Sequence, residues 1–369
     1  MKSTAGTGDD AAGARQADVA AASRSEMACR AAALVLVAIF LASVARFYHP
    51  GTGFTALIGL PEGHDYEAPA LRAIPHYDYP AWASYDGQFY AQRAFDPLVR
   101  DPAVDRAMDL APFRARRILF SWTAYAAGLG RPAWILEAYA LQNVVAWLLL
   151  AVLLTRWMPP RTARGLAMWT ACLFSHGLLW SVRFALLDGP SLLITAFAVK
   201  LIEDGHPLAS AAAVGLNGLG RETNVLGVLA QPIPRHARAV VRAVVACVLA
   251  VLPLLVWEDY LRSIYRSTIC AGTDPLLLQG TALAVVARGV FAAVRSSGPF
   301  SPAALSVCII VPLVVQAAGV IARADIRRPW WRVAIGYVAL MLVLDQVLWT
   351  PSTGAITRVL LPMTIGFNV

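Results

Sequence analysis

The polar stretch of residues 85–97, YDGQFYAQRAFDP, holds the side chains of this chain that best suit catalysis. Asp86 precedes Gly87, and glycine accepts the backbone angles of a tight turn that a side chain forbids. A carboxylate held at such a turn can act as a general base on a substrate hydroxyl. Four neighbours offer donors and rings for binding that substrate: Tyr85, Gln88, Tyr90 and Arg93. The same pattern equally suits a turn with interfacial aromatic rings and no chemistry.

Arginines and further carboxylates occur at the ends of several apolar segments. A planar guanidinium group contacts two phosphate oxygens at once and stays charged at any working pH. In the alternative interpretation Arg221 pairs with Glu222 or Asp188 and only fixes helix packing, because a charge within a membrane segment needs a partner. The residues predicted to hold a phosphate-bearing substrate are Arg116, Arg117, Arg221, Glu222 and Arg358, and a second catalytic candidate is Asp188.

Metal and redox chemistry have weaker support in the sequence. His49, His64 and His76 lie near two aspartates, Asp65 and Asp78. Their spacing is not that of a metal site, so they are predicted to be ordinary surface histidines. The five cysteines are scattered, mostly in apolar segments, without the spacing of a zinc or redox motif. No metal ligand is predicted.

The composition places these residues in a membrane protein. Hydrophobic residues make up 58% of the chain and charged residues 15%. The mean hydropathy of +0.58 is far from the soluble average. The net charge of +8 comes largely from arginines in short links between apolar runs, the pattern that orients membrane proteins. No nucleic-acid partner is therefore predicted. Membrane lipids are predicted as partners.

The elements that must position the candidate residues are membrane helices. The predicted fold class is all-α, a polytopic transmembrane helical bundle of about 8–11 membrane segments, judged by apolar run length. Residues 1–25 are predicted to form a disordered cytoplasmic tail, and residues 26–369 a single transmembrane domain. Within that domain, residues 48–115 are predicted to form a long first periplasmic loop with short interfacial helices. Residues 259–300 are predicted to form a second external segment.

Arginine clusters fix the orientation of the predicted spans, because positive links stay in the cytoplasm. The N-terminus is then cytoplasmic, and residues 207–219 and 222–233 form a hairpin of half-length helices. Residues 118–130 are short for a span, and residues 275–295 fit either a span or an interfacial segment. The remaining charged residues converge near the outer face: Asp86, Arg116, Arg117, Arg183, Asp188, Arg221, Glu222 and Arg358.

The order of these features resembles the GT-C class of integral-membrane glycosyltransferases. An N-terminal anchor precedes a large external loop with an Asp in an aromatic setting. The turn Leu187-Asp188-Gly189-Pro190 and a short hairpin tipped by Arg221-Glu222-Thr223 follow. The motifs YDGQFY, RARRIL and RETN are similar to those of a group of uncharacterised bacterial proteins of that class. The resemblance covers residues 30–369 in layout.

The resemblance implies transfer of a sugar from a polyprenyl-phosphate donor to an envelope acceptor, on the periplasmic face of a bacterial inner membrane. It implies that Asp86 is the base, that Arg221 lies near the lipid phosphate, and that Asp188 matches the acid before a later helix. Many such enzymes have two neighbouring acids in the first loop, whereas Asp86 has none until Asp96. The base and the use of a divalent metal therefore stay open. The alternative function is a non-catalytic membrane protein that binds or flips a lipid-linked precursor.

Overall fold

The chain is almost entirely helical in the part that the structure describes. The computed structural model describes residues 7–63, 66–265, 302–344, 346–349 and 354–369, with positions 287, 288, 291 and 295. The elements up to residue 127 are α1 (Thr7–Ala45), η1 (Thr55–Leu57), β1 (Leu60–Pro61), α2 (Pro69–Arg72), β2 (Asp78–Tyr79), η2 (Ala81–Ala83), α3 (Gly87–Arg93), α4 (Pro102–Arg106), α5 (Ala111–Arg116) and α6 (Leu119–Ala127). The later ones are α7 (Pro132–Leu154), α8 (Ala163–Leu173), α9 (His176–Arg183), α10 (Asp188–Glu203), α11 (Pro207–Gly218), η3 (Glu222–Ala230), α12 (Ala237–Tyr265), α14 (Pro302–Ala322), α15 (Pro329–Val343), η5 (Gln346–Trp349), α16 (Ala355–Val359) and α17 (Leu361–Asn368).

Among the described residues, three helices are long and apolar enough to cross a membrane: Ala22–Ala45 within α1, α7 and α12, of 24, 23 and 29 residues. The pair of α8 and α9 is bent by 45°, and counted as one span it raises the number to four. The 16 residues of α10 extend about 24 Å, less than the roughly 30 Å of a bilayer core. The number of full-length spans in the described part is therefore lower than the predicted number of membrane segments, about 8–11. Several segments that were predicted to cross the membrane fold as shorter helices.

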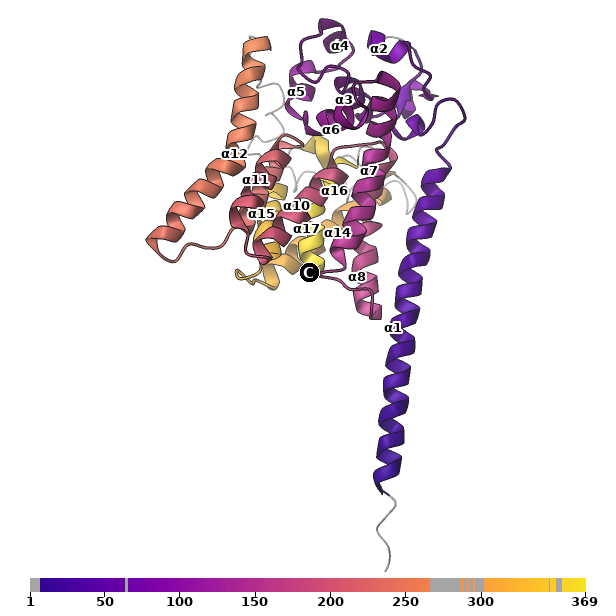
Figure 1. Ribbon diagram of the computed structural model, residues 1–369, viewed down its shortest axis with the longest axis vertical. Helices are drawn as coiled ribbons and strands as arrows, with labels where there is room; N and C mark the ends of the chain where they lie inside the picture. The colour runs from indigo at the N-terminus through magenta and orange to yellow at the C-terminus, as the bar shows by residue number, and fades with distance from the viewer. Residues whose placement is uncertain are drawn as a thin grey trace, which may run out of the picture.

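Helix α1 begins at Thr7, so it runs through most of the segment for which the composition predicts a disordered tail. Alanine is the strongest helix former, and this segment is rich in alanine, which explains the difference. Figure 1 shows α1 projecting well past the end of the bundle. The apolar end of α1 meets the bundle where Phe40 stacks on Trp147, with ring centroids 3.7 Å apart.

Short helices and the two strands form a cap over one end of the bundle (Figure 1). Strands β1 and β2 pair in parallel, with Leu60 opposite Asp78 and Pro61 opposite Tyr79. Helices α2, α4 and α5 each carry a proline in the first turn, where its missing N–H costs no helical hydrogen bond. Prolines thus divide residues 48–115 into short helices, as the sequence predicts. The apolar stretch predicted at residues 275–295 lies almost wholly outside the described residues.

Helix α10 lies inside the bundle, packed against α7, α9, α11, α15 and α17. A buried polar network fixes where α10 begins. Asn143 of α7 donates to the Leu186 carbonyl oxygen at 2.7 Å and accepts from the Ser181 hydroxyl at 2.9 Å. The Ser181 oxygen in turn accepts from the backbone N–H of Gly189 at 2.8 Å. This network satisfies the backbone of the turn before α10, and so it places Asp188 at the buried end of the helix.

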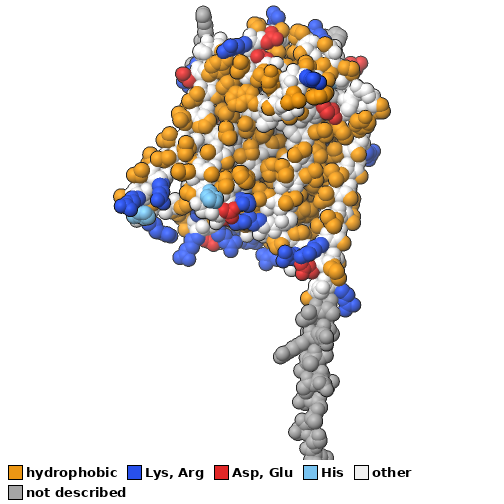
Figure 2. Space-filling view, viewed as in Figure 1, with side chains coloured by type: hydrophobic (Ala, Val, Ile, Leu, Met, Phe, Trp, Pro, Cys, Tyr) orange, Lys and Arg blue, Asp and Glu red, His pale blue; other side chains and the backbone are white. Residues whose placement is uncertain are grey.

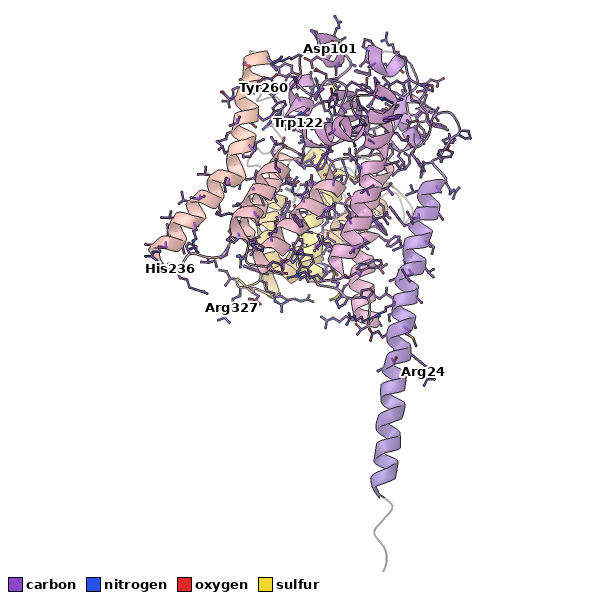
Figure 3. The ribbon with its side chains drawn as sticks, in the orientation of Figure 1. Arg24, Asp101, Trp122, His236, Tyr260 and Arg327 are labelled. Atoms are coloured by element: carbon purple, nitrogen blue, oxygen red, sulfur yellow. The ribbon has the colours of Figure 1, made fainter. Side chains whose placement is uncertain are left out.

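Charged side chains and apolar side chains occupy different levels of the surface. Figure 2 shows hydrophobic side chains over the middle of one face, with Lys and Arg gathered below them. Figure 3 places Arg24, His236 and Arg327 toward that lower end and Asp101 in the cap at the other end. An apolar belt between polar ends is the surface expected of a protein in a bilayer. With three or four candidate spans, the chain has the features of a multi-pass membrane protein.

Trp147 should carry much of the packing between α1, α7 and the end of α8. It is fully buried, stacks on Phe40, and donates from Nε1 to the Leu173 carbonyl oxygen at 2.9 Å. We expect Trp147→Ala to lower the free energy of unfolding by on the order of 3 kcal/mol, measured by denaturant unfolding in detergent. The control Leu149→Ala removes an exposed side chain of the same helix. If both variants unfold alike, this packing role is wrong.

Candidate functional site

Asp86 and Gly87 lie where the cap touches the bundle. A Cβ on Gly87 would be 2.0 Å from the carbonyl oxygen of Phe184 and 2.8 Å from that of Ile58. No side chain fits in this space, so the close approach of two backbone segments requires the glycine. Phe184 belongs to the loop that leads into α10. The contact therefore holds Asp86 close to the segment that carries Asp188.

Arg114 of α5 is the main partner of Asp86. Its Nη2 donates to Asp86 Oδ1 at 2.9 Å and to Asp109 Oδ2 at 2.6 Å. Its Nη1 donates to the hydroxyl oxygen of Tyr90 at 3.2 Å, and its guanidinium carbon lies 4.6 Å from the centroid of the Phe89 ring. The sequence run RARR does not tell which of its arginines faces Asp86. Arg114 is therefore a site residue that sequence reasoning missed.

Arg116 and Arg117 join the cap to two later elements. Arg117 donates from Nε and Nη2 to the two carboxylate oxygens of Glu222, at 2.9 and 3.2 Å. Its Nη1 donates to the Tyr90 hydroxyl oxygen at 3.2 Å. Arg116 donates to Glu258 of α12 at 2.7 Å and lies 3.9 Å from Glu222. The two-point contact of Arg117 fixes Glu222 at the start of η3.

A second group of charges surrounds Asp188. Arg221 donates to Asp188 Oδ1, and Arg358 of α16 donates to Asp188 Oδ2 at 3.1 Å. Arg358 also donates to the hydroxyl oxygen of Tyr85 at 3.0 Å. Asp188 is thus held between two cations at the first turn of α10. The pairing of Arg221 with Asp188 is one that the packing interpretation of the sequence predicts.

These groups form one charged layer between the cap and the bundle. Tyr85 contacts Arg358 of the group around Asp188, and the next residue, Asp86, contacts Arg114. Arg117 is close enough to Asp188 for their charges to interact. Because the charges balance, an anion that binds here must displace a carboxylate from an arginine. Each arginine contacts at least one acid of the layer, which consists of Arg114, Arg116, Arg117, Arg221, Arg358, Asp86, Asp109, Asp188, Glu222 and Glu258.

Exposure distinguishes the two carboxylates predicted to be catalytic. The side chain of Asp86 is 40% exposed, whereas that of Asp188 is 3% exposed. A general base must come within hydrogen-bond distance of the proton it accepts. The geometry of Asp86 permits this. Asp188 is enclosed, and its geometry suits holding Arg221 and Arg358 in place.

Two predicted binding residues lie outside the charged layer. Arg93 is fully buried in the cap, where it donates to Asp105 at 2.6 Å and to Asp96 at 3.4 Å. Gln88 is buried on α3, and its Oε1 has no hydrogen-bond partner within the described ranges. The position of Arg93 suits holding α3 and α4 together better than binding a ligand of the layer.

An apolar groove opens beside the layer, between α12 and the segment around α6. Its volume is about 530 Å³, within the range of small-molecule sites. Trp257 lies in its wall and donates from Nε1 to the Ala115 carbonyl oxygen at 2.9 Å. Figure 3 shows two further wall residues, Trp122 and Tyr260, in the half of the molecule that carries the cap. The wall also includes Leu98, Arg100, Leu219, Leu252, Pro253 and Val256.

The loop histidines differ from the surface residues predicted. His49 stacks on Tyr77, with ring centroids 4.3 Å apart. The side chain of His76 is only 9% exposed, and its Nε2 lies 3.0 Å from Asp78 Oδ1. The prediction of an ordinary surface histidine is therefore wrong for His76, because the fold of the cap encloses it. Two residues of this prediction lie outside the described residues: His64 and Asp65.

Comparison with known proteins adds no assignment. No family model matches the chain, no curated protein matches it, and no solved structure matches it. Function must therefore be argued from the residues of the site.

Gly87→Ala should separate Asp86 from the loop before α10. The added methyl group overlaps the Phe184 carbonyl oxygen, so we expect a loss of on the order of 1–3 kcal/mol in unfolding free energy. The control Gly218→Ala places its methyl group 3.2 Å from a Val225 side-chain carbon, which can shift. Denaturant unfolding of both variants measures the effect. Equal stability of Gly87→Ala and wild type would refute the close approach.

Asp109 should contribute to the pH dependence of stability. Burial alone would raise the pKa of its carboxyl, but the hydrogen bond and charge of Arg114 outweigh burial and lower the pKa. A lowered pKa stabilises the folded state above the unfolded value of about 3.9, and this stabilisation disappears as the pH falls through the folded value.

We therefore expect Asp109→Asn to lower the Tm at pH 7, with a difference from wild type that shrinks toward pH 3. The control Asp325→Asn removes a carboxylate from an exposed ion pair, which contributes little. Thermal unfolding in detergent across this pH range measures both variants. A difference that does not change with pH would show that the charge of Asp109 is not what stabilises the fold.

Proposed function

We propose that this protein is a membrane glycosyltransferase of GT-C type, which moves a sugar from a polyprenyl-phosphate donor to an envelope acceptor. The observation that carries the proposal is an apolar groove beside a layer of buried and partly buried arginines, in which the carboxylate of Asp86 is partly exposed. A lipid with a phosphate head and a reacting sugar needs these three features together. The protein would act on the periplasmic face of a bacterial inner membrane.

The groove and the arginines suit the two parts of such a donor. Trp257 lines the groove, and the next residue, Glu258, pairs with Arg116 at 2.7 Å. A polyprenyl chain in the groove would therefore bring its phosphate near Arg116 and Arg117. The phosphate would replace Glu222 or Glu258 as the partner of these arginines. The exchange keeps each guanidinium group paired, and the displaced carboxylate would turn toward water at the edge of the layer.

Asp86 supplies the proton acceptor in this proposal. It takes the proton of the acceptor hydroxyl as the oxygen attacks the anomeric carbon of the sugar. The bond from that carbon to the phosphate oxygen breaks, and polyprenyl phosphate leaves with the electron pair. The arginines of the layer stabilise the charge that develops on the leaving phosphate. Asp188 has a positioning role, since it orients Arg221 and Arg358.

Charge distribution supports the orientation. The end of the bundle that carries Arg24, His236 and Arg327 (Figure 3) is cytoplasmic by the positive-inside rule, so the cap and the charged layer face outward. The N-terminus is then cytoplasmic. Helices α14, of 21 residues, and α15, of 15 residues, complete the bundle as further membrane segments.

The test uses the purified full-length chain in nanodiscs with labelled polyprenyl-monophosphate hexoses and pentoses. Turnover is scored by the release of polyprenyl phosphate as the sugar is transferred to an acceptor or to water. We expect turnover by wild type and a loss of about 100-fold or more in Asp86→Asn, because a general base contributes roughly 10²–10⁴-fold. Binding of polyprenyl phosphate should persist in Asp86→Asn. The control Asp325→Asn removes an exposed carboxylate away from the layer.

The outcomes separate the proposal from its alternative. Turnover that Asp86→Asn leaves unchanged contradicts the role of Asp86. Binding without turnover of any donor contradicts the transferase and favours a protein that binds or flips a lipid-linked precursor. Arg117→Gln should weaken polyprenyl-phosphate binding by about 10-fold or more, since a charge-assisted bond contributes roughly 1.5–3 kcal/mol. Arg161→Gln, in an exposed pair with Glu26, is its control.

A further inference from the structure

We propose that Glu67, His76 and Asp78 form a binding site for a divalent transition metal, with Zn²⁺ as the best-suited ion. The three side chains lie in the cap, on the segments that precede α2 and enter β2. Each offers one ligand atom, and these atoms all lie within 4.8 Å of one another. The site uses none of the residues of the charged layer. It therefore stands independently of the proposed function.

The distances among the ligand atoms fit a metal ion. His76 Nε2 lies 3.0 Å from Asp78 Oδ1 and 3.7 Å from Glu67 Oε1. A tetrahedral ion with bonds of about 2.1 Å holds its ligand atoms about 3.4 Å apart. These two separations lie on either side of that value, and the two carboxylate ligand atoms lie within 4.8 Å of each other. A small movement of side chains is enough to close the site around an ion.

The orientation of the His76 ring leaves one nitrogen for a metal. Its Nδ1 lies 2.7 Å from the carbonyl oxygen of Ile74, which can only accept, so Nδ1 carries the hydrogen. Nε2 is buried, and no atom in the described part of the chain forms a hydrogen bond with it. A backbone carbonyl that fixes the tautomer of a histidine is the usual support of a metal ligand. The lone pair of Nε2 then faces two carboxylates.

The charge of this group calls for a cation. Glu67 and Asp78 bring two carboxylates to Nε2 of one imidazole ring. Arg72 lies 3.8 Å from Glu67 Oε2, on the side away from His76, and it offsets part of that charge. Glu67 Oε1 faces His76. A divalent ion between Oε1, Nε2 and Asp78 Oδ1 would neutralise the rest.

The fold of the cap holds the ligands rigidly. Gln92 of α3 is fully buried, accepts from the Ala68 backbone N–H at 2.7 Å and donates to the Tyr66 carbonyl oxygen at 2.8 Å. These bonds clamp the chain on both sides of Glu67. Asp78 pairs with Leu60 in the parallel sheet. The site is thus built by tertiary structure, which explains why spacing in the sequence does not reveal it.

The donor set indicates the kind of ion. Imidazole suits Zn²⁺ and other transition metals, whereas Mg²⁺ and Ca²⁺ prefer oxygen ligands alone. Three protein ligands with one position left for water form a known type of zinc site. The Asp78 side chain is 45% exposed, so water and the ion can reach that position. The ion would tie the segment before α2 to β2.

The test measures metal bound by the full-length protein in detergent, without a histidine tag. The protein is stripped with EDTA and dialysed against buffered Zn²⁺, and the bound metal is counted by mass spectrometry. We expect one Zn²⁺ per chain and a Zn²⁺-dependent rise in Tm, because an ion that binds only the folded state stabilises it. His76→Ala and Asp78→Asn should lose affinity by about 10-fold or more. The exposed His206→Ala should bind as wild type does.

Three results would overturn the site. They are no Zn²⁺ on the folded wild type, equal Zn²⁺ on wild type and both ligand variants, and a preference for Mg²⁺ or Ca²⁺ over Zn²⁺. Size-exclusion chromatography shows that each variant is folded. Since Asp78 is partly exposed, Asp78→Asn keeps the test valid if His76→Ala does not fold.

Discussion

The structure depends on the need of five arginines, three of them buried and two partly buried, for carboxylate partners. A guanidinium group that is withdrawn from water is costly unless it is paired and hydrogen-bonded, so each must find a partner where it lies. Here the partners come from different elements: Asp86 before α3, Asp188 in α10, Glu222 in η3 and Glu258 in α12. Pairing therefore ties the cap to the bundle. It also attaches α12, whose lower end leans away from the other helices in Figure 1.

The same balance sets what the layer can bind. A neutral set of ion pairs attracts a distant anion weakly, and a bound anion that takes over an arginine leaves the displaced carboxylate to turn toward water or another cation. The acids that can leave are those nearest the groove, Glu222 and Glu258, since Asp188 is enclosed by Arg221 and Arg358. A ligand with an apolar chain and an anionic head suits this arrangement better than a free anion does, because the groove adds apolar contact.

Apolar run length predicted a helical membrane protein, and the topology placed Asp86, Arg116 and Arg117 on the same side of the membrane. Which arginine faces Asp86 depends on how α5 docks on α3, and sequence spacing does not contain that information. The pair of Arg116 and Glu258 joins residues 142 positions apart. Likewise, Glu67 and His76 meet only because Gln92 and the parallel strands fold the cap. Contacts that tertiary packing creates were the ones missed.

The proposed metal site and Asp86 share one segment of chain, residues 58–61. The Ile58 carbonyl lies against Gly87, and the Gly59 carbonyl oxygen accepts from the Tyr85 backbone N–H at 3.2 Å. Leu60 pairs with Asp78 across the two strands. An ion that holds Asp78 therefore also restrains the strand against which Asp86 is placed. The metal need not touch a substrate to matter, because its effect on Asp86 passes through four residues of backbone.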